Sequence, residues 1–220
     1  MIAFPFALRG FGNPPPPRPD ERDELLDCFM PVYDVVERHR IAVAAPPAIV
    51  LRAAKQQDLM GSRVVRAIFR ARELALGAAP DARRRQRGLL PEMLALGWGM
   101  LAERPDREIV MGAVTKPWES NVTFRALPAD QFAAYEEPGF VKIVWTLRAD
   151  PVGEHGSLFL TETRAVATDA AARARFRTYW GFVSPGIAVI RRLSLRPLKR
   201  AAESRARELE PSLSHRARSG

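Results

Sequence analysis

Four ionisable side chains on two predicted strands have the types and spacing needed to move protons or to hold a polar ligand. Glu37 and His39 are two residues apart, which places both on one strand face about 7 Å apart. A carboxylate beside an imidazole that titrates near neutral pH could take a proton from a carbon acid or a hydroxyl. The alternative is that Glu37 to Arg40 form the solvated start of the strand, with charges paired to a neighbour.

Glu162 and Arg164 form the second pair, in the last predicted strand. They share one face with three apolar residues, Leu158, Leu160 and Val166. We expect this face to point into the apolar interior, so Glu162 would pair with Arg164, or either would pair with Glu37 or His39. The arginine could then orient a ligand carbonyl or carboxylate. The alternative is a ladder of exposed ion pairs across strands.

The side chains expected around a ligand are apolar or aromatic. They are Ile143, Trp145, Leu160, Phe176 and Tyr179. Trp145 shares a strand face with Ile143, and Tyr179 lies in the middle of an apolar helical stripe, where a buried hydroxyl would need a partner. The alternative for these aromatic residues is simple packing in the core.

The elements that must position these residues can be predicted from apolar periodicity. The predicted strands are 33–44, 99–103, 108–115, 140–148 and 157–168. The predicted helices are about 46–57, 63–76, 89–96 and a long one that starts after Asp169, bends or breaks at Ser184-Pro185-Gly186 and ends near Glu208. The segment 116–138 is ambiguous, with a short helix possible over 128–135.

Composition divides the chain into three parts. Residues 1–30 form a proline-rich, extended lead-in with a short helix over 21–30, residues 31–208 form the folded domain, and residues 209–220 form a disordered basic tail. Of the 220 residues, 47% are hydrophobic, which is enough for one sizeable core.

The order of elements resembles the START-like helix-grip superfamily, also called SRPBCC, which includes polyketide cyclase/dehydrase-like proteins. Ile41-Ala-Val-Ala-Ala-Pro-Pro47 looks like that family's first strand and the start of its first helix, and 141–147 and 158–166 look like its late strands. The resemblance implies an α+β fold with a curved antiparallel sheet wrapped around a long C-terminal helix. It also implies a cavity between them for an apolar or amphipathic molecule, in which some relatives catalyse cyclisation or dehydration and others only bind.

Charge and residue counts limit the other possibilities. The net charge is +9, and nine lysine and arginine residues against three glutamates lie from Arg191 to Gly220, so weak binding of anionic partners is expected there. Three scattered histidines and the lone Cys28 make no zinc site, and no cofactor is required. A single cysteine and the absence of a long apolar run favour a cytoplasmic protein.

Three functional hypotheses follow. The first is binding of an apolar or aromatic small molecule between the sheet and the closing helix. The second is a cyclase or dehydratase in which Glu37 and His39 act as base and acid, Arg164 holds a carbonyl, and Tyr179 donates a hydrogen bond. The third is a basic adaptor whose C-terminal tail binds anionic membrane or nucleic acid.

Overall fold

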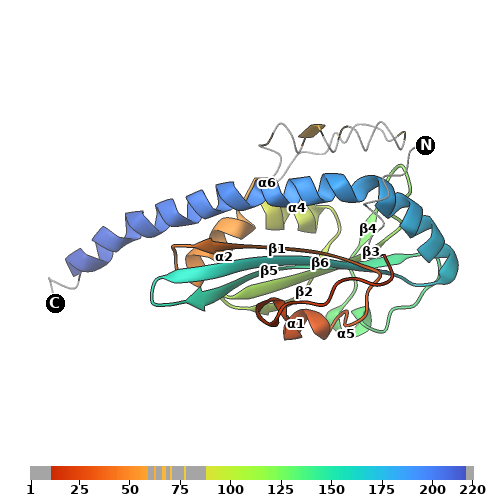
Figure 1. Cartoon of the computed structure of the whole chain (residues 1–220), viewed down its shortest axis with the longest axis horizontal. Coiled ribbons are helices and arrows are strands. Elements are labelled where there is room, and N and C mark those ends of the chain that lie inside the picture. Colours follow the sequence, from red (N-terminus) through yellow and green to blue (C-terminus); the bar gives the residue numbers. More distant parts are fainter. Residues whose placement is uncertain are drawn as a thin grey trace.

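The computed structural model describes residues 11–58, 62, 66, 67, 70, 77 and 88–216, with side chains up to Leu209. The chain has an α+β fold in which a curved antiparallel sheet lies against a long C-terminal helix (Figure 1). The strands are β1 (Val35–Val43), β2 (Gly99–Arg104), β3 (Glu108–Thr115), β4 (Phe124–Arg125), β5 (Val141–Val152) and β6 (Gly156–Ala167). The order across the sheet is β1-β6-β5-β3-β2, and β4 pairs with β3. The predicted fold class is therefore confirmed.

The helices follow the predicted order with some changes at their ends. They are η1 (Pro19–Glu21), α1 (Glu24–Asp27), α2 (Pro47–Lys55), α4 (Leu89–Ala95), α5 (Ala129–Phe132) and α6 (Ala170–Arg216). Pro47 is the first residue of α2, where a missing N–H costs nothing. Of the predicted helix over 63–76, Arg66, Ala67 and Arg70 are helical, and the rest lies outside the described residues.

The long helix α6 continues to Arg216 rather than ending near Glu208. It bends but does not break, as its curved path in Figure 1 shows. Pro185 lies inside it, and a proline there removes one helical hydrogen bond and displaces the preceding turn, which accounts for a bend. None of the described helices has a stretch that is long and apolar enough to cross a membrane.

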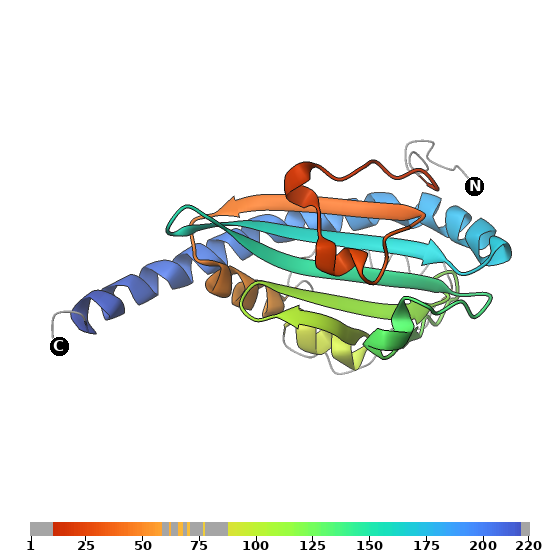
Figure 2. The same ribbon diagram turned by 90° about the horizontal axis from the view of Figure 1, so that it is seen from below.

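Both faces of the sheet are covered. Helices α2, α4 and α6 cover one face, and residues 11–34 cross the other together with α5 (Figure 2). We call residues 11–34 the N-terminal strap. On the helix face, Met111 and Trp145 pack with Val50 of α2 and Leu198 of α6. On the strap face, Leu26 and Met30 pack against three buried residues, Val110, Val144 and Phe132.

Strand alternation assigns every side chain to one of these two faces. In β1, β3, β5 and β6, odd-numbered residues point to the helix face and even-numbered residues point to the strap face. Helix and strap together bury the two faces, so β3 is buried along its whole length.

Candidate functional site

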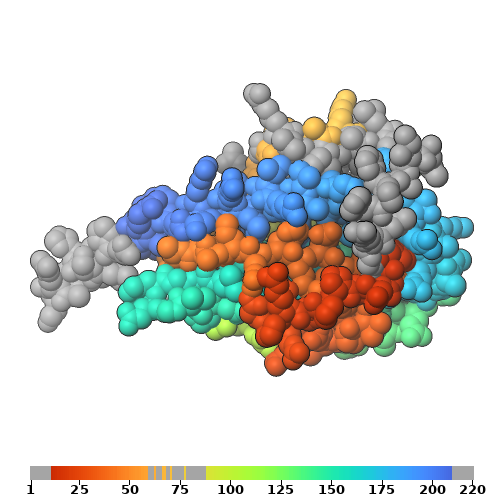
Figure 3. All heavy atoms as spheres, viewed as in Figure 1, coloured from red at the N-terminus to blue at the C-terminus, as the bar shows by residue number. Residues whose placement is uncertain are grey.

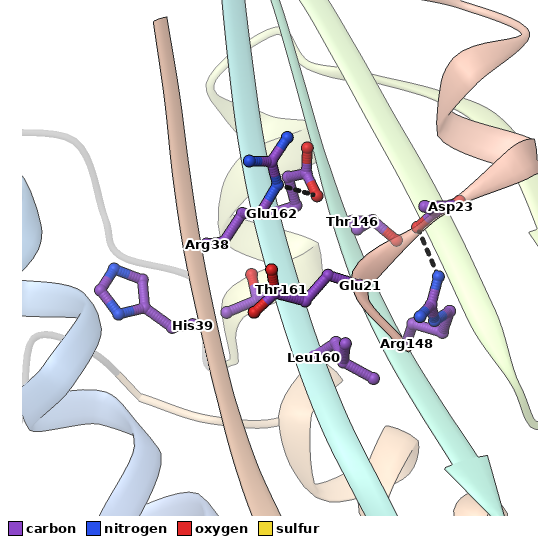
Figure 4. Close-up of a pocket in the computed structure, with 9 residues that line it drawn as sticks. All are labelled: Glu21, Asp23, Arg38, His39, Thr146, Arg148, Leu160, Thr161 and Glu162. Carbon is purple, nitrogen blue, oxygen red and sulfur yellow. Dashed lines mark ion pairs between the residues drawn. The ribbon is translucent and has the colours of Figure 1, made fainter. Parts of the chain in front are cut away.

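The sheet separates the two ionisable pairs that the sequence predicts. Glu37 and His39 lie on the helix face, whereas Glu162 and Arg164 lie on the strap face. The predicted pairing of Glu162 with Arg164 is confirmed, and the alternative, in which either of them pairs with Glu37 or His39, is wrong. Figure 4 shows His39 pointing away from Glu162 on the other side of β1. Because β1 pairs with β6 in register, the neighbour of Glu37 across the strands is Thr163.

The helix-face pair belongs to a small polar cluster beneath α6. His39 Nε2 lies 3.3 Å from Glu37 Oε2, and Arg191 of α6 donates hydrogen bonds to the hydroxyls of Thr161 at 3.3 Å and Thr163 at 2.7 Å. Removal from water lowers the pKa of Arg191 to about 10, although the charge of Glu37 acts in the opposite direction. Glu37 and His39 therefore form the predicted pair, but the arginine near them is Arg191 and not the predicted Arg164.

On the strap face, Arg164 is held by the chain itself. Its Nε lies 2.6 Å from Glu162 Oε1, and its Nη1 lies 2.5 Å from Asp27 Oδ1 and 2.7 Å from the carbonyl oxygen of Met30. Arg38 Nε approaches the other oxygen of Glu162 at 3.0 Å. With 1% of its surface exposed, Arg164 joins strand to strap and does not face an open cavity.

Arg148 on β5 makes a similar connection. It donates hydrogen bonds to the carbonyl oxygens of Arg22 at 2.7 Å and Asp20 at 2.9 Å, and lies 3.4 Å from Asp23 Oδ2 and 3.0 Å from Asp150 Oδ2 (Figure 4). The space that these side chains enclose has a volume of about 10 Å³, which is room for about one water molecule. This cluster therefore fastens the strap and cannot hold an organic ligand.

Glu108 is a buried carboxyl that sequence reasoning missed. It is 1% exposed, and its Oε1 accepts a hydrogen bond from Thr146 at 3.2 Å. Burial, together with a hydrogen bond and the negative charge of Asp23, raises the pKa of Glu108 to about 8. The signal in the sequence is a single carboxyl directly before a run of apolar residues, 109–114.

The predicted aromatic and apolar lining is also divided by the sheet. Ile143, Phe176 and Tyr179 come together at one end of the helix face. Trp145 is 4% exposed and packs edge-on against the ring of Trp98, with ring centroids 6.2 Å apart. Leu160 lies on the opposite face, beside the arginine cluster under the strap.

A larger cavity lies between the end of α2 and the second half of α6. Its volume is about 480 Å³, and its walls combine apolar and polar side chains. They include Ala53, Gln57 and Asp58 on the α2 side and Leu193, Leu198, Ala201 and Arg205 on the α6 side. Gln57 ties the two helices together by donating a hydrogen bond of 2.6 Å to the carbonyl oxygen of Ser194. The predicted cavity was to lie between sheet and helix, and this one lies between two helices.

The charged side chains of Asp58 and Arg205 line this cavity, and Arg205 supplies hydrogen-bond donors to it. Its Nη1 is buried and has no hydrogen-bond partner in the described part of the chain. A guanidinium nitrogen withdrawn from water in this way is unfavourable unless a hydrogen-bond acceptor reaches it. Sequence reasoning placed Arg205 in a general basic region and missed it. No group of three or more metal-binding side chains occurs among the described residues.

No protein-family model matches the chain, and no curated protein matches it significantly. Solved structures that are weakly similar to the chain include three bacterial proteins. A hypothetical protein, jhp0584, from Helicobacter pylori is 8% identical, with a TM-score of 0.40, 79% of this chain covered and 92% of that one. A conserved protein from Geobacillus kaustophilus is 10% identical (TM-score 0.34, 80% and 97% covered). The Mll3558 protein from Rhizobium loti is 13% identical (TM-score 0.29, 71% and 96% covered).

Proposed function

We propose that the protein binds an apolar or aromatic small molecule that carries an acidic group, in the cavity between α2 and α6. The observation that carries this proposal is the buried, unpaired Nη1 of Arg205 in the wall of a cavity of about 480 Å³. Ligand sites typically have volumes of about 300–1,000 Å³ and combine apolar walls with a few polar groups that orient the ligand.

The walls suit a ligand with two chemically different ends. Leu193 and Leu198 supply apolar contact, and Arg205 supplies a donor for a carboxylate or a similar anion. The resemblance of Ile41–Pro47 to START-like proteins supports a ligand-binding role, because that superfamily binds such molecules beside its long helix.

The cyclase or dehydratase hypothesis needs Glu37 and Arg164 at one ligand. The sheet lies between them, and Arg164 is bonded to Glu162 and the strap. The geometry thus favours binding over this four-residue mechanism.

The test is titration calorimetry of the full chain with dodecanoate and with dodecanol. Dodecanoate should bind the wild type, and Arg205→Gln should weaken it by about tenfold or more, because hydrogen bonds to charged groups have this magnitude. The same substitution should change the affinity for dodecanol, which has no charge, by less than about threefold. The matched control is Arg207→Gln, an exposed arginine two residues along α6.

Ala201→Trp tests the location of the site separately. Ala201 lines the cavity and is itself exposed, so a large side chain there should fill the space without disturbing the core. We expect this variant to lose dodecanoate binding and keep its unfolding temperature. Absence of binding by the wild type, or binding that Ala201→Trp leaves unchanged, would refute the proposal.

A further inference from the structure

The side of α6 that faces away from the sheet exposes a row of apolar side chains. Phe182 is 61% exposed, and Val189 and Leu193 are each 43% exposed. Their spacing of seven and four residues places all three on one side of the helix. The opposite side of α6 is occupied, since Leu198 and Ala202 pack in the main core.

Unpaired arginines flank this apolar row. Arg192, Arg196 and Arg200 are exposed, and the described part of the chain holds no ion-pair partner for them. From Ala170 to Ala202 the helix carries eight lysine and arginine residues and no acidic residue. We call Phe182, Val189, Leu193, Arg192, Arg196 and Arg200 together the α6 outer face. The last turns of α6 extend beyond the sheet in Figure 1, and Figure 3 shows α6, in blue, at the surface along one side of the molecule.

We propose that the α6 outer face docks on an anionic lipid membrane, with the helix lying along the surface. Apolar side chains of such a helix enter the boundary between headgroups and acyl chains, while its cations contact lipid phosphates and carboxylates. The absence of acidic side chains removes the repulsion that would oppose approach to a negative surface.

The apolar row distinguishes a membrane from a nucleic acid. Both partners attract arginines, but Val189 and Leu193 have no aromatic ring on which a base could stack. A membrane gives the exposed Phe182, Val189 and Leu193 an apolar environment, whereas a phosphate backbone leaves them in water. Leu193 also lines the cavity between α2 and α6, whereas Phe182 and Val189 do not, so these two residues allow docking to be tested separately from ligand binding.

The test is co-sedimentation of the full chain with vesicles of phosphatidylcholine alone or mixed with phosphatidylserine. The wild type should bind the mixed vesicles and not the neutral ones. Neutralising Arg192, Arg196 and Arg200 to glutamine should lower the partition coefficient by about a hundredfold. In the control variant, Arg18, Arg104 and Arg107, which lie outside α6, are replaced by glutamine. This variant loses the same amount of charge, and its partition coefficient should change by less than about threefold.

A second variant tests the apolar contribution. Phe182→Ser with Val189→Ser should lower partitioning by about tenfold or more, even at high salt, and neither residue lines the cavity between α2 and α6. Circular dichroism should show an unchanged helix content, since both side chains are exposed. Three results would overturn the proposal: no binding to the mixed vesicles, an equal loss in the control, or binding to duplex DNA instead that the serine substitutions leave unchanged.

Discussion

Arg164 Nε lies 2.6 Å from Oε1 of Glu162, two residues earlier on the same face of β6. The same guanidinium donates a hydrogen bond to the carbonyl oxygen of Met30 in the strap, so one ion pair joins the sheet to the segment that crosses it. Arg38 and Arg148 repeat this arrangement by donating to the carbonyl oxygens of Pro15, Asp20 and Arg22. Arginines on three strands therefore hold the strap through its backbone.

The first prediction concerns this ion pair. Replacing Arg164 with methionine leaves the carboxylate of Glu162 buried with one partner fewer, so we expect the free energy of unfolding to fall by about 3–5 kcal/mol. Urea denaturation measures the loss, and limited proteolysis should cut the strap earlier than in the wild type. The double variant Glu162→Gln with Arg164→Met should be less destabilised than Arg164→Met alone. A loss below about 1 kcal/mol would show that the pair does not hold the strap.

The second prediction concerns pH and Glu108. The pKa of this carboxyl is about 8 in the folded protein against its ordinary value of 4.5, so the folded state binds more protons between these two values. Stability therefore falls as pH rises from about 4.5 to 8. Glu108→Gln should remove this fall. It should stabilise the protein at pH 8 by about 2 kcal/mol, because each pKa unit corresponds to about 1.4 kcal/mol and we count only half of the pKa shift.

Urea unfolding at a series of pH values measures this effect. Below pH 4.5 the variant and the wild type should have nearly equal stability, because Glu108 is then protonated in both states. Glu154→Gln, at a side chain that is 92% exposed, serves as the control and should leave the pH profile unchanged. Parallel profiles for Glu108→Gln and the wild type would contradict the prediction.

The third prediction separates packing from ligand binding at Trp145. Trp145→Ala should lower the free energy of unfolding by about 3–5 kcal/mol, because it leaves a cavity beside Trp98 in the main core. Trp145→Phe keeps most of the packing, and Trp145 does not line the cavity between α2 and α6, so dodecanoate affinity should stay within about twofold. Calorimetric titration of this variant checks the point, and a tenfold loss of affinity would move the site to the helix face of the sheet.

The fourth prediction concerns the close packing of the strap face at Gly112. A Cβ atom there would lie 2.5 Å from Leu101 Cδ1 and 2.8 Å from Phe132 Cε2. Gly112→Ala should therefore destabilise the protein by about 1–3 kcal/mol through overpacking. Thermal unfolding measures the change, and combining it with Leu101→Val should restore part of the stability. If the single variant is as stable as the wild type, α5 does not pack as tightly on β3 as described.

Much of the fold could be predicted from local patterns in the sequence. Apolar residues at three- and four-residue steps define α6, and Pro46-Pro47 marks the change from β1 to α2, because these signals depend on backbone geometry over a few residues. The pairing of β5 with β6 also follows from the hairpin at 151–156, since the turn sets the register.

The direction in which β6 faces could not be predicted in the same way. The even-numbered side of this strand holds Leu160, Glu162 and Arg164, and the odd-numbered side holds Phe159, Thr161 and Thr163. Each side therefore mixes apolar and polar residues. Alternation identifies the buried face only when the other face is in water. Here the strap covers the face that would otherwise be in water. Because Glu162 and Arg164 are buried under it, the two sides of β6 have a similar mixture of polar and apolar residues.

By itself, the sequence determined most of the elements, their order and the antiparallel hairpins, because each depends on neighbouring residues; it did not predict β4 or the last turns of α6. The tertiary structure alone decided that Glu37 and Arg164 lie on opposite faces, that the strap accepts hydrogen bonds from arginines on three strands, and that Arg205 lines a cavity beside α2. These relationships join residues far apart in the chain, and several use backbone carbonyl oxygens, which every residue has and no side-chain pattern reveals.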